Sequence, residues 1–212
     1  ASIYFAASRS YILATSNLLR EEKMAVVIQD VCGSQDSGYF FPTLSGVAQS
    51  INFYHIHGEK SEEGIVNLAF GLGRIVVGGG KTLRFSPYHP KNILQLSTND
   101  LALKETQNEM YALNLKPEEF KTSIDDAVNL HLFDINEAKH FRNMRHVAST
   151  WDRENQRISD MNFAEGRKVI TFANILKYDT MPLAKIMQDL LSISEKEMQT
   201  PVELEFAVNM DV

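Results

Sequence analysis

The feature that most constrains the fold is a helix pattern followed by a strand pattern near the end of the chain. Pro182 stands at the start of a stretch in which apolar residues recur at helical spacing. These residues are Leu183, Ile186, Met187, Leu190, Leu191 and Ile193. Residues 202–208 then alternate between apolar and polar, as in a strand with one buried face. Because the helix must bury its apolar stripe, we expect it to pack on a sheet.

Further segments upstream have the composition of strands. Residues 24–29 form a continuous apolar run, which is typical of a strand covered on both faces, and residues 75–77 predict a second buried strand. Residues 39–41 and 45–54 predict β-type segments, and residues 62–68 predict a short helix.

The second half of the chain alternates between the two kinds of structure. Residues 97–145 are polar with helical spacing, whereas residues 146–151, 157–162 and 168–175 predict strands. The polar turn 152–156 joins the first two of these strands. The pattern predicts an α/β chain of the α+β kind, with mixed sheets flanked by helices.

Composition and charge argue against several classes of function. The 21 basic and 27 acidic residues are mixed along the chain and give a net charge of -6, so nucleic acid is a poor candidate partner. No apolar stretch approaches the roughly 20 residues of a membrane span, and the start lacks a signal-peptide pattern, so we expect a cytoplasmic protein. Cys32 is the single cysteine, which excludes an internal disulfide and a cysteine metal cluster.

The two ends predict that the chain is part of a longer protein. It begins without methionine, and only residues 209–212 follow the final strand. Because that strand is expected to turn and pair with another, we expect its partner to lie outside the chain.

The final strand carries two carboxylates on one face. Glu203 and Glu205 alternate with apolar residues, and same-side residues of a strand lie about 7 Å apart, so both reach one cation. The alternative is an edge strand with a solvated polar face, and the pattern by itself favours that alternative.

The glycine segment 71–82 fits neither familiar phosphate motif. A Walker-type loop that ends at Gly80 requires glycine where Ile75 stands, and the dinucleotide fingerprint requires a third glycine where Val76 stands. Gly71 and Gly73 therefore predict tight loops that are either structural or lie over phosphates.

Two histidines form a weaker candidate site. His55 and His57 would project from the same side of a strand and could ligate a metal, but no third ligand is identifiable. The pattern favours ordinary surface histidines.

Four motifs, taken in order, resemble a known family. They are Met-Ala-Val-Val-Ile-Gln-Asp-Val at 24–31, Ser-Gly-Val-Ala at 45–48, Ala-Phe-Gly-Leu-Gly at 69–73 with Val76, Val77 and Gly79, and Pro-Val-Glu-Leu-Glu-Phe at 201–206. In this order they resemble the nucleotide-binding domain of phosphoenolpyruvate synthase and pyruvate phosphate dikinase. The resemblance implies an ATP-grasp fold in which ATP is held with carboxylate-bound Mg²⁺.

The resemblance also implies roles for individual residues. By position, Gln29, Asp30 and Val31 resemble the hinge beside adenine. Glu205 resembles the metal-binding glutamate of the family, and Glu203 stands where an aspartate is common.

The glycine loop is implied to lie near the phosphates, with Gly71, Gly73 and Arg74 as nucleotide-binding candidates. Arg74 stands where the family often has glutamate, so the glutamate's role is not carried over.

Other parts of the family site have no counterpart here. Nothing in the chain matches the family's early lysine, its phosphate-binding arginine or the glutamine beyond Glu205. The phosphocarrier histidine and the pyruvate site belong to other domains, so no residue of this chain is expected to be catalytic.

These implications define three regions and one function. We expect an ATP-grasp-like lobe at 1–96, an insertion or lid at 97–162, and a return helix with the metal-site strand at 163–212. The chain would supply part of the ATP site of a phosphotransferase that phosphorylates its own histidine and then pyruvate, and it would be inactive alone. Expected partners are ATP, pyruvate and a phosphohistidine domain, without nucleic acid or membrane, and a homo-oligomer is compatible with the sequence. The alternatives are a non-catalytic module derived from the same lobe, or a phosphotransferase with another acceptor.

Overall fold

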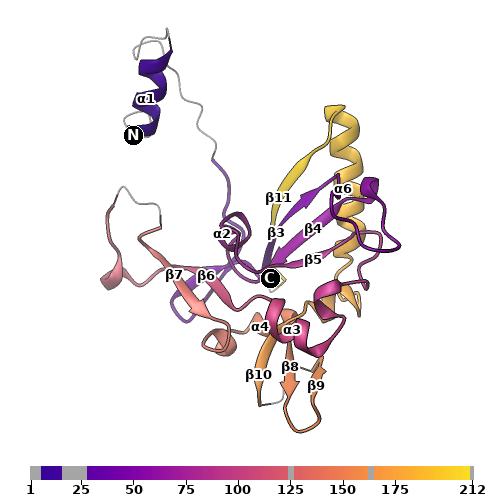
Figure 1. The fold of residues 1–212 in the computed structure, drawn as a ribbon. Helices are drawn as coiled ribbons and strands as arrows, with labels where there is room; N and C mark the ends of the chain where they lie inside the picture. Colours follow the sequence, from indigo (N-terminus) through magenta and orange to yellow (C-terminus); the bar gives the residue numbers. More distant parts are fainter. Residues whose placement is uncertain (1–5, 16–27, 124–126, 162–164, 211–212) are drawn as a thin grey trace. The chain divides into compact units, whose positions relative to one another are not determined.

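The structure, a computed structural model, describes residues 6–15, 28–123, 127–161 and 165–210 (Figure 1). It divides into two compact units, Ala1–Val31 and Cys32–Val212. The first unit contains helix α1 (Ala6–Ala14). Most of the apolar run at 24–29 lies outside the described residues, so the strand predicted there stays a prediction.

The second unit is built on three antiparallel sheets. The first has the order β11-β3-β4-β5, with β3 at Leu44–Gln49, β4 at Ile65–Ala69, β5 at Leu83–Phe85 and β11 at Glu203–Val208. One face of this sheet is apolar and contributes Ala48, Val66, Leu68 and other buried side chains to the main hydrophobic core. The strand predicted at the end of the chain is confirmed, and it pairs with β3 inside this chain.

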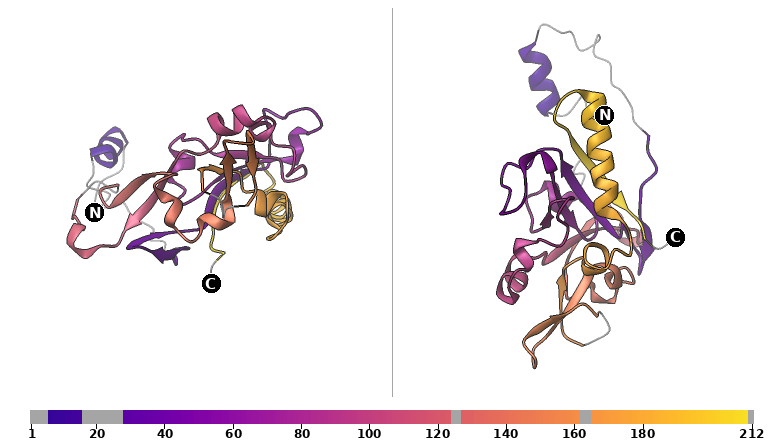
Figure 2. Two further views of the ribbon diagram at one scale, coloured as in Figure 1. Left: turned by 90° about the horizontal axis from the view of Figure 1, so that it is seen from below. Right: turned by 90° about the vertical axis from the view of Figure 1, so that its right-hand side faces the viewer.

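Helix α6 (Leu183–Met198) runs alongside this sheet (Figures 1 and 2). The predicted helix is confirmed, but only part of its apolar stripe is covered. Leu183, Met187 and Leu191 are buried in the core. The three remaining members, Ile186, Leu190 and Ile193, are 40%, 42% and 60% exposed. The contact with the sheet is therefore narrower than the sequence stripe, because a helix resting on one surface buries a single row of side chains.

The second sheet has the order β1-β2-β6-β7 and joins distant parts of the chain. Its strands are β1 (Ser34–Asp36), β2 (Tyr39–Phe41), β6 (Glu109–Asn114) and β7 (Leu130–Asp134). The helical interpretation of residues 97–145 is wrong for β6 and β7, although α3 (Asn99–Glu105) and α4 (Met144–Val147) are helices. The strands prevail because Met110 and Ala112 bury one face of β6 completely, with the period of two of a strand. Short 3-10 turns occur at Leu94–Leu96, Pro117–Glu119 and Ala138–His140.

The third sheet has the order β10-β8-β9. Strands β8 (Ala148–Asp152) and β9 (Arg157–Ser159) form the predicted hairpin, and β10 (Arg167–Ile170) confirms the start of the strand predicted at 168–175. Its end is wrong, because Phe172 adopts a left-handed conformation and begins the short helix α5 (Ala173–Leu176).

Two predictions near the glycine segment are also wrong. Residues 75–77 belong to the short helix α2 (Arg74–Val77), in which Ile75 is buried and Val77 is 69% exposed. Ile75 packs against Gly80, where an added Cβ would lie 2.5 Å from its side chain, so the turn closes on itself. Residues 61–63 form a 3-10 turn (Ser61–Glu63) that ends at Gly64 with φ 72°, and β4 occupies the rest of the predicted helix.

The α+β class is thus confirmed, with six α-helices and three antiparallel sheets in the part of the chain that the structure describes. Residues 34–41 share a sheet with β6 and β7, so the region predicted as an insertion is continuous with earlier strands. Within these described ranges, no helix is long and apolar enough to cross a membrane.

Candidate functional site

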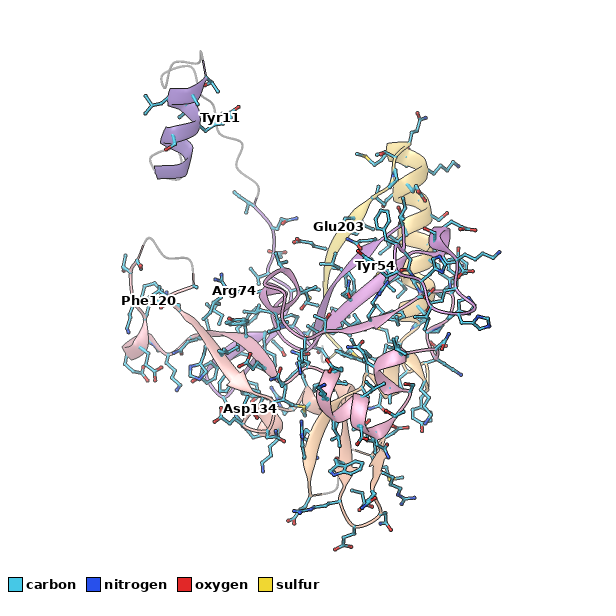
Figure 3. The ribbon with its side chains drawn as sticks, viewed as in Figure 1. Tyr11, Tyr54, Arg74, Phe120, Asp134 and Glu203 are labelled. Carbon is cyan, nitrogen blue, oxygen red and sulfur yellow. The ribbon has the colours of Figure 1, made fainter. Side chains whose placement is uncertain are left out.

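The two glutamates of β11 lie on the exposed side of the first sheet. Glu203 and Glu205 are exposed, whereas Leu204 and Phe206 point the other way and pack against the core. Figure 3 labels Glu203 on β11, together with Arg74 on α2. The predicted alternation of the strand is therefore confirmed, and β11 is an edge strand among the described residues.

The register extends this face across the whole sheet. Glu205 lies opposite Val47, Val47 opposite Asn67, and Asn67 opposite Arg84, one residue from each strand. Because directly paired residues share a side of a sheet, these four side chains form one row. We call the surface made by Glu203, Glu205, Val47, Gln49, Asn67 and Arg84 the carboxylate face.

The two carboxylates differ in their partners. The Gln49 Nε2 amide donates a hydrogen bond of 2.5 Å to Glu203 Oε2. Glu205 makes no hydrogen bond or ion pair with any residue that the structure describes. Glu205 is therefore the carboxylate that remains open to a ligand, while Glu203 is oriented by its neighbour.

The glycine loop lies at one end of the carboxylate face. Ser45 shares the side of Val47 in β3, and its Oγ donates a buried hydrogen bond of 2.7 Å to the Gly71 carbonyl. The site of an added Cβ on Gly73 lies 3.7 Å from the Ser45 side chain. The structure thus brings Gly71 and Gly73 to the same face as the two glutamates.

Gly71 is required by its conformation and by its surroundings. Its φ is +86°, and an added Cβ would lie 2.8 Å from the Tyr111 carbonyl oxygen. The Leu72 amide donates a hydrogen bond of 3.0 Å to that same carbonyl, so the loop is fixed to strand β6. This gives Gly71 a structural reason that is independent of any ligand.

Arg74 begins α2 and is exposed, with its guanidinium carbon 5.8 Å from the centre of the Tyr111 ring. This geometry is a cation–π contact, which occupies one face of the guanidinium group. A role for Arg74 in nucleotide binding stays a prediction.

The rejection of a Walker-type loop agrees with the contacts of Lys81. Its Nζ atom donates a hydrogen bond to the Lys104 carbonyl, so the ammonium group is bound to backbone. The dinucleotide fingerprint still fails on spacing, although the reason based on a strand at 75–77 was wrong, since a helix begins at Arg74.

The remaining predicted residues lie elsewhere. Gln29, Asp30 and Val31 are exposed, belong to the first compact unit and have no helix or strand. Their proximity to adenine stays a prediction. His55 and His57 are exposed in a turn region, so the strand predicted to align them is wrong. Over the described ranges, no group of three or more His, Cys, Asp or Glu is arranged to hold a metal.

The carboxylate face nevertheless suits one kind of cation. Mg²⁺ dehydrates reluctantly and is usually bound through one or two carboxylates together with phosphate oxygens and waters. Glu205, with Glu203 one pleat away, supplies such a partial ligand set. The donors fit a magnesium ion that arrives with phosphates, and they do not fit a metal bound by protein alone.

One cluster on this face has no counterpart in the sequence predictions. Asn52 accepts a hydrogen bond of 2.5 Å from Arg84 Nη2 through Oδ1 and donates one of 3.1 Å to the buried Glu59 carboxylate through Nδ2. Residues of this cluster line a cavity of about 340 Å³. The alternation of β4 around Asn67 is the signal that would have placed this region in a sheet.

Comparison with protein families gives one match. The sequence model described as pyruvate phosphate dikinase, AMP/ATP-binding domain, matches residues 1–212. Comparisons with curated proteins and with solved structures gave no significant match.

Proposed function

Because the chain belongs to the pyruvate phosphate dikinase AMP/ATP-binding domain family, we propose that its carboxylate face holds the magnesium complex of ATP. ATP binding follows from the family, and the location on this face is our proposal. The observation that carries it is the open carboxylate of Glu205 on the same face as the loop of Gly71 and Gly73.

In this proposal, Glu205 binds magnesium directly and Glu203 has a supporting role. Glu203 already accepts a hydrogen bond from Gln49, so its carboxylate is fixed in place and partly neutralised. When bound, the ion neutralises charge on the phosphates, which is the main requirement of phosphoryl transfer. The protein's part is to hold the nucleotide in a fixed orientation.

The glycine loop would border the phosphate end of the nucleotide. Gly71 has no side chain, and the region around it presents backbone at the surface of β3 and β4. Helix α2 has a single turn, so we assign it no dipole-based anion site. The predicted hinge at Gln29, Asp30 and Val31 remains our candidate for the adenine end.

We further propose an ATP-grasp fold and a cytoplasmic parent enzyme that transfers phosphate from ATP to its own histidine and then to pyruvate. This chain alone would be inactive, because it contains no residue proposed to accept the phosphoryl group. A homo-oligomer is compatible with the proposal. The rival functions remain a non-catalytic module and a phosphotransferase with another acceptor.

The test is the magnesium dependence of ATP binding by Glu205→Gln. Calorimetric titration of the wild type at several magnesium concentrations should show affinity that rises with magnesium, and the variant should lose this rise. Glu118→Gln is the matched control, since Glu118 is exposed on a 3-10 turn beyond the second sheet. Magnesium dependence that survives in Glu205→Gln would refute the proposed metal role.

Turnover separates the catalytic reading from its non-catalytic rival. Phosphoenolpyruvate formation by the parent protein should fall sharply when it carries Glu205→Ala. A parent that binds MgATP through Glu205 but transfers no phosphate to any acceptor would support the regulatory module instead.

A further inference from the structure

The carboxylate face ends, on the strand farthest from Glu205, in an arginine. Arg84 lies in the middle of β5 and is half-buried. It is joined to Glu205 through the row of Val47 and Asn67. Three strand spacings separate the two ends of the row, which is about 14 Å between Cα atoms.

Arg84 is a cation without a carboxylate partner in the part of the chain that the structure describes. Its two side-chain hydrogen bonds both use Nη2, which donates to Asn52 Oδ1 at 2.5 Å and to the Tyr54 carbonyl at 3.0 Å. A guanidinium group has five N–H donors, so those on Nε and Nη1 remain available. A half-buried arginine that meets only neutral acceptors keeps its charge for another group.

The nearest buried carboxylate does not neutralise this charge directly. Glu59 accepts hydrogen bonds of 3.1 Å from Asn52 Nδ2 and from the Ile56 amide, both through Oε2. The Asn52 side chain therefore stands between Glu59 and Arg84. This arrangement fixes the orientation of the guanidinium group without forming an ion pair.

The backbone of β5 is fixed as well. The Arg84 amide donates a hydrogen bond of 2.8 Å to Gln95 Oε1, and Gln95 Nε2 donates to the Thr82 and Glu105 carbonyls at 2.7 and 2.8 Å. A side chain on such a support keeps its position before a ligand arrives, which lowers the entropic cost of binding.

The guanidinium group borders the cavity of about 340 Å³. The cavity is walled by Asn67, Thr82, Asn92 and Gln95, with Tyr54 at the loop that covers it. Tyr54, labelled in Figure 3, is 79% exposed. Apart from the bound Glu59, the polar wall thus consists of neutral groups and one cation, which is the composition of a site for an anion.

We infer that Arg84 binds the phosphates of the nucleotide at the end of the carboxylate face opposite the magnesium ligand. This inference rests on the proposed function, and it adds a specific phosphate-binding cation with Asn67 beneath the path between the two ends. The separation of Glu205 and Arg84 suits a chain of phosphates with magnesium at the carboxylate end. The rival explanation is a purely structural arginine that anchors residues 52–54.

Calorimetric titration of four proteins with MgATP and with adenosine tests the inference. They are the wild type, Arg84→Gln, Arg84→Lys and Arg153→Gln. Arg153 is the matched control, because it is an exposed arginine in the β8–β9 turn without a partner among the described residues. Thermal melting of each variant reports any loss of folding.

Arg84→Gln should raise the Kd for MgATP at least about tenfold, as expected for the loss of a charged hydrogen bond. Its Kd for adenosine should be unchanged, Arg84→Lys should fall between, and Arg153→Gln should match the wild type. An unchanged Kd for MgATP, or an equal weakening of MgATP and adenosine, would overturn the inference.

Two further outcomes are decided by the same set. If Arg84→Gln does not fold, Arg84→Lys decides, since lysine keeps the charge but loses the planar fork; an unchanged Kd for MgATP then overturns the assignment. If the wild type binds MgATP and Glu205→Gln abolishes the magnesium dependence while Arg84→Gln has no effect, only the Arg84 inference fails. If the wild type itself shows no magnesium-dependent binding, the proposed function fails and the inference with it.

Discussion

Gln49 and Glu203 lie directly opposite each other on β3 and β11, and the Gln49 amide donates a hydrogen bond of 2.5 Å to the Glu203 carboxylate. This bond joins the edge strand to its neighbour on the carboxylate face. It also removes one of the two carboxylates from competition for a cation and leaves Glu205 open.

Gln49→Glu should destabilise this pair. Two carboxylates directly opposite each other on antiparallel strands repel, and we expect a loss of up to about 1 kcal/mol at pH 7. Thermal unfolding at pH 7 and at pH 4 measures the effect, which should shrink at the lower pH as the carboxylates protonate. The exchange variant Gln49→Glu with Glu203→Gln should regain the wild-type melting temperature. If it does not, the amide–carboxylate bond is not the source of the loss.

Gly46 and Phe206 are also directly paired, on the apolar side of the same two strands. A Cβ added at Gly46 would lie 2.6 Å from the Phe206 ring and 2.5 Å from the Asn67 carbonyl oxygen. Gly46→Ala should therefore destabilise the protein by about 1–3 kcal/mol, as overpacking of a core does.

Denaturant unfolding measures this loss, and Gly73→Ala is the control. Gly73 has a helical φ of -60°, and its nearest side-chain contact would be an ordinary 3.7 Å. Equal destabilisation by the two substitutions would mean that the Phe206 ring yields to the new methyl group.

Much of this sheet could be predicted from the sequence, but its site could not be assembled. The alternation of β11 and the stripe of α6 are long enough to fix element type. Residues 75–77 are three apolar residues, which fit a strand and a single helical turn equally, and the packing of Ile75 on Gly80 decides for the helix.

The row of Glu205, Val47, Asn67 and Arg84 depends on register between four distant segments. Register follows from tertiary pairing, which no local pattern contains. Arg84 was missed because β5 is three residues long and its neighbour β4 was interpreted as a helix. The family resemblance supplied Glu205, since that residue lies in a motif that the chain retains.

Asp160 gives a prediction of pH dependence in the third sheet. Burial raises the pKa of its carboxyl, but hydrogen bonds from Lys177 at 2.7 Å and Tyr178 at 2.9 Å lower it more, so the net direction of the pKa is downward. A lowered pKa in the folded state adds stability above the unfolded value of about 3.9, and this stability is lost as the pH falls through the folded pKa.

Asp160→Asn should therefore cost about 1 kcal/mol at pH 7, a figure reduced because the ion pair is largely solvent-exposed. The difference from the wild type should close as the pH falls below about 4. Melting temperatures across that range measure it. Asp189→Asn, which breaks the exposed Lys185–Asp189 pair on α6, should leave stability within error. A constant Asp160→Asn penalty at all pH values would assign the effect to packing.

Ser45 connects the stability of the sheet to the proposed nucleotide site. Its Oγ–H bond to the Gly71 carbonyl is buried, so Ser45→Ala leaves that carbonyl unpaired and should cost about 1–2 kcal/mol. Because this bond holds the glycine loop on the carboxylate face, the variant should also bind MgATP more weakly than its stability loss alone explains. Calorimetry at a temperature where both proteins are fully folded separates the two effects. Ser97→Ala removes an exposed hydroxyl that bonds the Leu94 carbonyl and should alter neither quantity. Full MgATP affinity in folded Ser45→Ala would show that the glycine loop does not contact the nucleotide.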